Sequence, residues 1–283
     1  MSGSVLSEIS DGVALFTLHR PERNNAYTVD MELEYHALLE IAGADEAVRV
    51  IVLTGSGASF CPGLDIELLR SSVAAGTPLT AATRRPPYYP LTIPKPIIAA
   101  VNGACAGIGL ILALTADVRF AAAGSRWSTS WARRGLAGEH GMTWLIPRLV
   151  GMSRAIELMI SGRTFSAEHA HAIGLVHEVV EPDAVLERAL AYARDLAVNA
   201  SPTSMALIKH AAWRHQLTPS LPEAWTDSMR QATAIADRTD DGQEGAASWV
   251  ERRPPRFAPL PADFDPASFS KGPIHGSWHP VEL

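Results

Sequence analysis

The chain of 283 residues has few cysteines and no excess of positive charge. Its two cysteines, Cys61 and Cys105, cannot build a disulfide scaffold or a four-thiolate zinc site. Lys and Arg number 24 against 30 Asp and Glu, which gives a formal net charge of −6. Because phosphate backbones are bound by a basic surplus that this chain lacks, we expect no nucleic-acid partner.

The sequence also predicts neither a targeting signal nor a membrane-spanning segment. The opening residues, MSGSVLSEISDG, contain neither the basic nor the apolar part of a signal peptide. Glycines, Asn102 and Asp117 interrupt the longest apolar stretches well before the length of a membrane span. Apolar residues nevertheless make up 47% of the chain and charged residues 19%, as in folded globular proteins. A cytoplasmic protein without a membrane partner is predicted.

Common cofactor and nucleophile motifs are absent. The turn Gly107-Ile108-Gly109 is followed by Leu112 where a dinucleotide fingerprint needs a third glycine. No Walker A sequence occurs, and the stretch from Gly57 to Cys61 lacks the second glycine of a nucleophile elbow. The nearby pair of histidines at 169 and 171 has no further ligands in zinc-site spacing. The sequence predicts neither a metal ion nor a resident cofactor.

Strands and helices alternate along the first part of the chain. Short apolar runs at 13–20, 48–57 and 97–102 predict strands, and a further strand is expected from Asp117. An amphipathic helix is predicted after Thr28, and an apolar helix after the glycine-rich turn that follows the third run. This alternation indicates an α/β fold with crossover connections.

The rest of the chain has a different character. A stretch from Ile66 to Lys95, rich in Pro, Thr and Ala, predicts a lid, a binding loop or disorder. Helical patterns dominate from Ser201, and a Pro-rich tail follows Phe257. We interpret the tail as an extended arm that can lie across a neighbouring subunit. The predicted division is a core over 1–200, a helical region over 201–257 and an extension over 258–283.

Two glycine-rich turns are candidate sites for chemistry. The segments Ser59–Ile66 and Asn102–Gly109 each join a buried strand to a helix, and each is rich in glycine. Such junctions present free backbone N–H groups where the helix dipole favours negative charge. Two of these groups meeting in space would form an oxyanion hole, whereas each turn alone is also compatible with an ordinary strand-to-helix loop.

Four longer segments of the chain resemble a known protein family. In order and spacing they are similar to the crotonase (enoyl-CoA hydratase/isomerase) superfamily, over roughly residues 10–257. The segments are SFCPGLDIELL, KPIIAAVNGACAGIGLILALTADVRFAAAGSRW, RRGLAGEHGMTWLIPRLVGMSRAIELMISGRTFSAEHAHAIGLVHEVV and EGAASWVERRPPRF. The resemblance implies a spiral of ββα units, a helical C-terminal oligomerisation region that builds a homotrimer or a dimer of trimers, and an acyl-CoA thioester substrate that brings the CoA with it.

The resemblance also assigns residues to the site. It implies that the backbone N–H groups of Leu64 and Ile108 are the oxyanion-hole donors. Arg23 is the expected partner of a CoA phosphate, with a solvated surface arginine as the alternative. The residues expected to contact CoA are Arg23, Ala26, Gly63, Leu64, Asp65, Ile66 and Gly107.

Two positions depart from the hydratases of this superfamily. Those enzymes use two glutamates to activate water, and the matching positions here hold Ile111 and Trp131. Neither side chain accepts a proton, so hydration by the two-glutamate route is doubtful. We expect Trp131, Ile111 and Met142 to line an acyl pocket instead.

One carboxylate remains in the right segment. Glu139 matches the Glu or Asp that isomerases of the superfamily carry, and we expect it to shuttle a proton from within apolar surroundings that raise its pKa. His140 beside it is a possible acid/base or a structural residue. The predicted function is therefore double-bond isomerisation of an enoyl-CoA. The alternatives are hydratase or hydrolase chemistry with Glu139 and His140 handling water, or a catalytically silent acyl-CoA-binding subunit.

Overall fold

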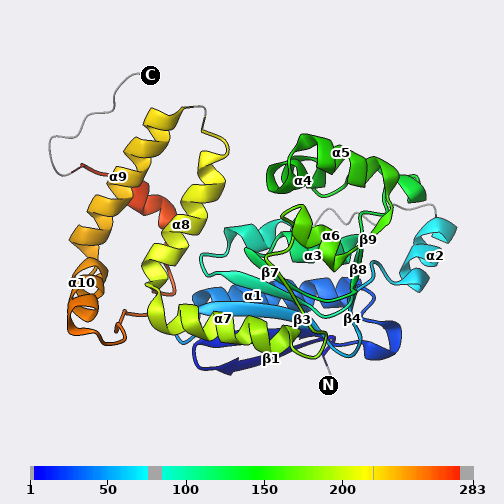
Figure 1. The fold of residues 1–283 in the computed structure, drawn as a ribbon, viewed down its shortest axis with the longest axis horizontal. Coiled ribbons are helices and arrows are strands. Elements are labelled where there is room, and N and C mark those ends of the chain that lie inside the picture. Colours follow the sequence, from blue (N-terminus) through cyan, green and yellow to red (C-terminus); the bar gives the residue numbers. More distant parts are fainter. Residues whose placement is uncertain (1–2, 76–84, 219, 275–283) are drawn as a thin grey trace.

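The computed structural model describes residues 3–75, 85–218 and 220–274. Two β-sheets with their flanking helices form the core, and a group of C-terminal helices stands to one side of it (Figure 1). No helix in the described ranges has the length and apolar character needed to cross a bilayer.

The larger sheet has the order β1-β2-β3-β5-β7-β10, in which β1 and β2 are antiparallel and every other neighbouring pair is parallel. Its strands are β1 (Val5–Ser10), β2 (Val13–Leu18), β3 (Val50–Gly55), β5 (Ile97–Val101), β7 (Val118–Ala122) and β10 (Glu178–Val180). The apolar runs of the sequence therefore became β2, β3, β5 and β7, as predicted.

The smaller sheet has the order β4-β6-β8-β9 and consists of three-residue strands. They are β4 (Ser59–Cys61), β6 (Ala104–Ala106), β8 (Arg126–Ser128) and β9 (Thr164–Ser166). Three times the chain runs from a strand of the larger sheet into one of the smaller sheet and then into a helix, as β3-β4-α2, β5-β6-α3 and β7-β8-α4. This repeat is the predicted spiral of ββα units.

Helices follow the strands in the core. They are α1 (Val29–Ala44), α2 (Ile66–Ala75), α3 (Ile108–Leu114), α4 (Met142–Val150), α5 (Met152–Ser161), α6 (Ala167–Ala172) and α7 (Val185–Asn199). The α1 helix begins after Thr28, whose side-chain oxygen accepts a hydrogen bond from the Met31 amide. Short 3-10 turns lie at η1 (Pro21–Arg23), η2 (Tyr89–Thr92) and η3 (Ala132–Arg134).

The larger sheet is covered on both faces, which explains why its central strands are mostly apolar; Thr54 of β3 and Arg119 of β7 are buried exceptions. Alternate residues of one strand face opposite layers: Val50 and Val52 pack in the cluster that includes α7, whereas Ile51 and Leu53 pack in the cluster that includes α1 and α3. The second cluster is the main core of the protein. It also lies beneath the turns that follow the smaller sheet.

The C-terminal helical region is thin. It comprises α8 (Pro202–His215), α9 (Leu221–Arg238), α10 (Asp241–Glu251) and the turn η4 (Pro266–Ser270). Its small core consists of Leu207, Ala234 and Phe269. The tail was expected to be an extended arm, and for residues 258–274 that expectation is wrong. The turn η4 folds back against α8 and α9 (Figure 1). Its Phe269 side chain is only 7% exposed and packs with Leu207 of α8 and Ala234 of α9. Residues 275–283 lie outside the described residues.

A buried ion pair attaches α8 to the core. The Lys209 ammonium lies 2.8 Å from the Asp117 carboxylate and donates to the Pro90 and Lys95 carbonyls at 3.2 and 3.1 Å. Burial lowers the pKa of Lys209, and Asp117 opposes that shift. Because removing one partner of such a pair leaves a buried charge, the contact holds α8 firmly against the core.

The stretch between Ile66 and Lys95 contains two elements among its described residues. It begins with α2 and ends with η2, where Tyr89 packs edge-on against His36 with ring centroids 5.6 Å apart. Residues 76–84 of the predicted lid or loop lie outside the described residues.

Exposed apolar side chains on the C-terminal helices predict self-association as a homotrimer or dimer of trimers. The exposed fractions reach 69% for Ile208, 85% for Trp249 and 79% for Val250. Leu207, next to Ile208 on α8, is by contrast buried. Large apolar side chains left this exposed can be buried when subunits associate. Light scattering should therefore give a mass well above the 30.3 kDa of one chain. A stable monomer would refute the prediction, and Val250→Ser should weaken the assembly.

Candidate active site

The two glycine-rich turns of the sequence lie against each other. They follow β4 and β6, which are parallel neighbours with Cys61 opposite Cys105. A Cβ built on Gly107 would lie 3.8 Å from the Cα of Gly63, so the two turns approach within van der Waals distance. The residues that follow these glycines, Leu64 and Ile108, are the predicted oxyanion donors. The parallel pairing of two short strands thus brings together residues that are far apart in the chain.

The Leu64 amide is left open by its own surroundings. Tyr27 forms a parallel bridge with Leu64: the Tyr27 amide donates to the Gly63 carbonyl at 2.8 Å, and the Asp65 amide donates to the Tyr27 carbonyl at 2.9 Å. These bonds fix the backbone on both sides of Leu64. Within the described part of the chain, the Leu64 amide itself donates to no group.

The Ile108 amide is open for a different reason. Ile108 is the first residue of α3, and the first N–H groups of a helix have no partner inside it. Gly107 before it has φ +53° and ψ −120°, a conformation that favours glycine. The α3 N-terminus thereby directs its positive dipole end toward the junction of the two turns.

Close backbone contact holds α3 against β4. A Cβ on Gly109 would lie 2.0 Å from the Cys61 carbonyl oxygen, so only glycine fits there. The Cys61 thiol donates to the Gly63 carbonyl at 3.7 Å and the Cys105 thiol donates to the Gly109 carbonyl at 3.5 Å. Burial raises the pKa of Cys61 to about 12. Both thiols are therefore supports of the turns, without the thiolate character of a nucleophile.

The turn from Arg20 to Ala26 docks beside Leu64. The Arg20 guanidinium donates to the Ala26 carbonyl at 2.6 Å and to the Asp65 carboxylate at 2.9 Å. Hydrogen bonding from the Glu67 amide and the ion pair with Arg20 hold the pKa of Asp65 below its usual range. Asp65, predicted to contact CoA, is thus already engaged, and its visible role is to tie the two segments together. This ion pair joins residues that no short motif links.

Arg23 lies at the surface of the same region. Its guanidinium is 3.0 Å from the Glu67 carboxylate, and the two side chains are 48% and 64% exposed. Ile66, the first residue of α2, is exposed beside them. Exposed ion pairs of this type contribute about 0–1 kcal/mol. A phosphate can therefore replace Glu67 as the partner of Arg23 at little cost.

The predicted acyl-pocket residues lie together in the main core. Ile111, Trp131 and Met142 are 1%, 4% and 1% exposed and belong to the same apolar cluster. Ile111 follows Ile108 by three residues on α3, so both lie on one side of the helix, next to the paired turns. The two positions where hydratases carry glutamates are buried among apolar side chains.

Glu139 lies in the turn between η3 and α4. Its carbonyl accepts the Met142 amide at 3.1 Å, and its carboxylate forms no ion pair or hydrogen bond with the residues that the structure describes. The side chain is exposed, so the expected enclosure by apolar residues is wrong for this structure. His140 beside it is also exposed and has φ +57°. The helix that follows this turn, α4, contacts α3, whose first residue is Ile108.

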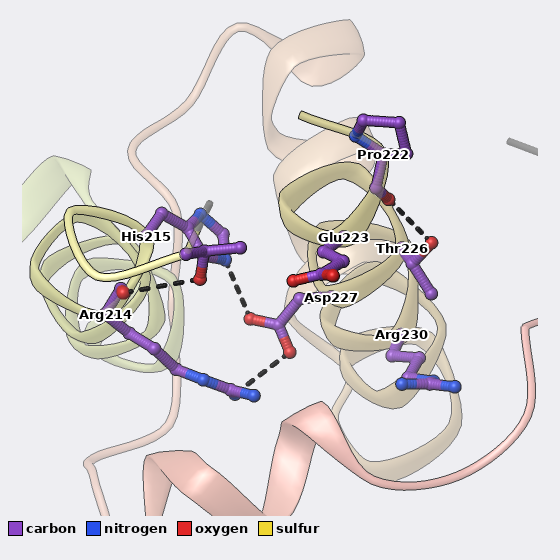
Figure 2. Close-up of a pocket in the computed structure, with 8 residues that line it drawn as sticks. Arg214, His215, Pro222, Glu223, Thr226, Asp227 and Arg230 are labelled. Carbon is purple, nitrogen blue, oxygen red and sulfur yellow. Dashed lines mark hydrogen bonds and ion pairs between the residues drawn. The ribbon is translucent and has the colours of Figure 1, made fainter. Parts of the chain in front are cut away.

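A separate cavity of about 380 Å³ lies between α8 and α9, away from the paired turns (Figure 2). Asp227 of α9 binds Arg214 and His215 of α8 there, at 3.0 and 2.9 Å. Sequence reasoning did not find this cluster. No group of metal-ligating side chains suited to holding an ion occurs in the ranges described above.

The spiral of ββα units, the helical region and the paired glycine turns define a crotonase fold. The chain belongs to the enoyl-CoA hydratase/isomerase family, whose model matches residues 8–259. The sequence-based identification is confirmed.

Related proteins carry two kinds of name. A 1,2-epoxyphenylacetyl-CoA isomerase of Escherichia coli (strain K12) is 33% identical over 89% of this chain and 97% of its own length. A probable enoyl-CoA hydratase of Rhodobacter capsulatus is 39% identical over 88% of this chain and 96% of its own. The crystal structure of a probable enoyl-CoA hydratase/isomerase from Mycobacterium abscessus has a TM-score of 0.83 and 36% identity, covering 90% of this chain and 98% of that one.

The geometry of the paired turns predicts that Gly107→Val slows turnover of an enoyl-CoA thioester by about 10²–10³-fold, because a lost oxyanion donor costs that much. Gly124→Val is the matched control, since Gly124 also has positive φ but faces open space. Initial rates of both variants, measured well below their unfolding temperatures, should separate them. Equal rates would show that the turn at Gly107 does not contribute.

Proposed function

We propose that the protein is an enoyl-CoA isomerase that moves a carbon–carbon double bond through a thioester enolate. The observation that carries the proposal is the pair of open backbone amides at Leu64 and Ile108 beside two apolar positions, Ile111 and Trp131. The amides suit an oxyanion, and the apolar residues provide no group to activate water.

The reaction needs one base that later acts as an acid. Glu139 removes a proton from the carbon next to the thioester carbonyl, and the electron pair moves into the enolate, whose oxygen lies between the two amides. The same carboxyl group then returns the proton two carbons further along the chain, and the double bond ends in conjugation with the thioester. Proton and electrons balance without a cofactor. Backbone amides suit this task because they are already oriented before charge develops.

The exposed position of Glu139 is compatible with this role. Its carboxylate is not held by another described residue, so it is available to a substrate. A bound acyl chain lying over Ile111, Trp131 and Met142 would itself shield the carboxylate from water. Arg23 and the backbone around Ala26, Gly63 and Ile66 are the proposed contacts of the CoA part.

Hydration is the second candidate function. Relatives named as hydratases occur beside one named as an isomerase, and His140 next to Glu139 offers a second group for handling water. Against it stand Ile111 and Trp131, because neither accepts a proton and both occupy volume that water would need. A silent acyl-CoA-binding subunit is a third candidate, and the open amides count against it because mere binding does not require an oxyanion hole.

The proposal predicts that Glu139→Gln lowers isomerase turnover by about 10²–10⁴-fold, since it removes a general base. Affinity for acyl-CoA should stay nearly unchanged because the CoA contacts and both amides remain. Exchange of deuterium at the carbon beside the thioester should stop as well. Glu181→Gln, at another exposed glutamate, is the control and should behave as wild type. A Glu139→Gln variant that isomerises and exchanges at the wild-type rate would exclude Glu139 and favour His140.

The proposal also predicts a poor hydratase. Crotonyl-CoA incubated with the pure protein should lose its conjugated absorbance very slowly, because no pair of glutamates holds the water. Ile111→Glu alone should not restore hydration, since Trp131 still fills the second position. Hydration with turnover of roughly 1–10³ per second, the ordinary range for enzymes, would contradict the prediction.

A further inference from the structure

Two tryptophans connect the C-terminal helical region to the core. Trp213 of α8 and Trp144 of α4 have ring centroids 6.2 Å apart with an interplanar angle of 37°. Both rings are half-buried and pack against the main apolar cluster, the same cluster that holds Ile111, Trp131 and Met142. Aromatic pairs at this separation attract each other beyond simple burial. A residue of the helical region therefore touches the helix that follows Glu139.

On the α4 side, backbone hydrogen bonds link the start of this helix to the turn that carries Glu139. The Met142 amide donates to the Glu139 carbonyl at 3.1 Å, and the Trp144 amide donates to the Gly141 carbonyl at 3.0 Å. A Cβ built on Gly138 would lie 2.6 Å from Cγ2 of Thr143, so the turn packs tightly on the start of α4. Arg148 also covers Trp144, with its guanidinium carbon 3.8 Å from the ring centroid. A shift of α4 therefore moves Glu139 with it.

On the α8 side, Trp213 is held from both directions. One turn earlier, Lys209 is paired with Asp117 of the core at 2.8 Å. Immediately after Trp213, Arg214 and His215 bind Asp227 of α9 (Figure 2). Anchors before and after the tryptophan leave α8 little freedom to move. The Trp213 ring is thus a fixed surface against which α4 rests.

We propose that Trp213 is a positioning residue for the reaction: through Trp144 it holds α4, and with it the Glu139 turn, against the apolar cluster beside the oxyanion hole. The inference rests on the proposed role of Glu139 as the base. It gives the C-terminal helical region a part in catalysis within its own chain, in addition to any part in assembly. Glu139 needs such a support because its carboxylate has no described partner to fix it.

The first test compares Trp213→Ala with Trp213→Phe. Misplacing a catalytic group by about 1 Å costs up to about 10²-fold in rate, so Trp213→Ala should lower kcat by about 10–10²-fold and change KM by less than about threefold. Trp213→Phe keeps an aromatic ring against Trp144 and should recover most of kcat. Leu217→Ala, at an exposed leucine four residues further on, is the matched control and should retain wild-type kcat. All rates are measured well below the unfolding temperature of each variant.

A second readout does not depend on the chemistry. Hydrogen–deuterium exchange of the backbone amides over residues 138–146 should become faster in Trp213→Ala and stay unchanged in Leu217→Ala. In a double-mutant cycle, the effects of Trp144→Ala and Trp213→Ala on kcat should be smaller together than their sum, because both remove the same contact.

The outcomes separate the two proposals. If Trp213→Ala keeps wild-type kcat, or loses kcat without faster exchange over 138–146, the positioning role is refuted. If Glu139→Gln is fully active, the proposed base is wrong, and faster exchange together with the kcat loss of Trp213→Ala would still show that Trp213 positions the turn for another group in it. Loss of stability with normal kcat in the folded enzyme would mark Trp213 as a structural residue only and would refute the inference.

Discussion

The whole site depends on the parallel pairing of β4 with β6. These strands have only three residues each, yet their pairing aligns the two turns that follow them. The approach of Gly109 to the Cys61 carbonyl, where any side chain would clash, brings the start of α3 directly against the end of β4. Leu64 and Ile108 therefore reach the same place from corresponding positions of two successive ββα units. Their chemistry comes from the backbone, so the identity of their side chains matters little.

Around this pair of turns, apolar side chains stand at positions where polar catalytic groups could stand. Ile111 and Trp131 belong to the main core, and the carboxylate of Glu139 stands outside it. The Arg20–Asp65 ion pair locks the turn from Arg20 to Ala26 beside Leu64 without contributing a reactive group. The apolar side of the site thus belongs to the main core, while Glu139, the proposed acid/base group, lies on the exposed turn before α4.

The sequence was sufficient to predict β2, β3, β5 and β7, the helix after Thr28 and the two glycine-rich turns, because apolar runs and capping residues are local signals; β1, which is exposed after Val5, was not predicted. It did not reveal β4, β6 or β8, since three residues carry too little periodicity. The Arg20–Asp65 and Trp144–Trp213 contacts join residues far apart in the chain, so no spacing rule finds them. The exposure of Glu139 was missed because its apolar neighbours in sequence, Met142 and Trp144, turn toward the core while Glu139 does not.

The fold-back of the tail affects the order in which the protein can be built. Phe269 supplies one of the few buried side chains between α8 and α9, although it is translated after both helices are complete. The strands of the larger sheet, by contrast, all lie before residue 181 and can pair while synthesis continues. The helical layer must therefore wait with Leu207 and Ala234 uncovered until the last part of the chain arrives. During that interval the nascent chain exposes apolar side chains that are buried in the finished protein, and exposed apolar surface of this kind favours aggregation.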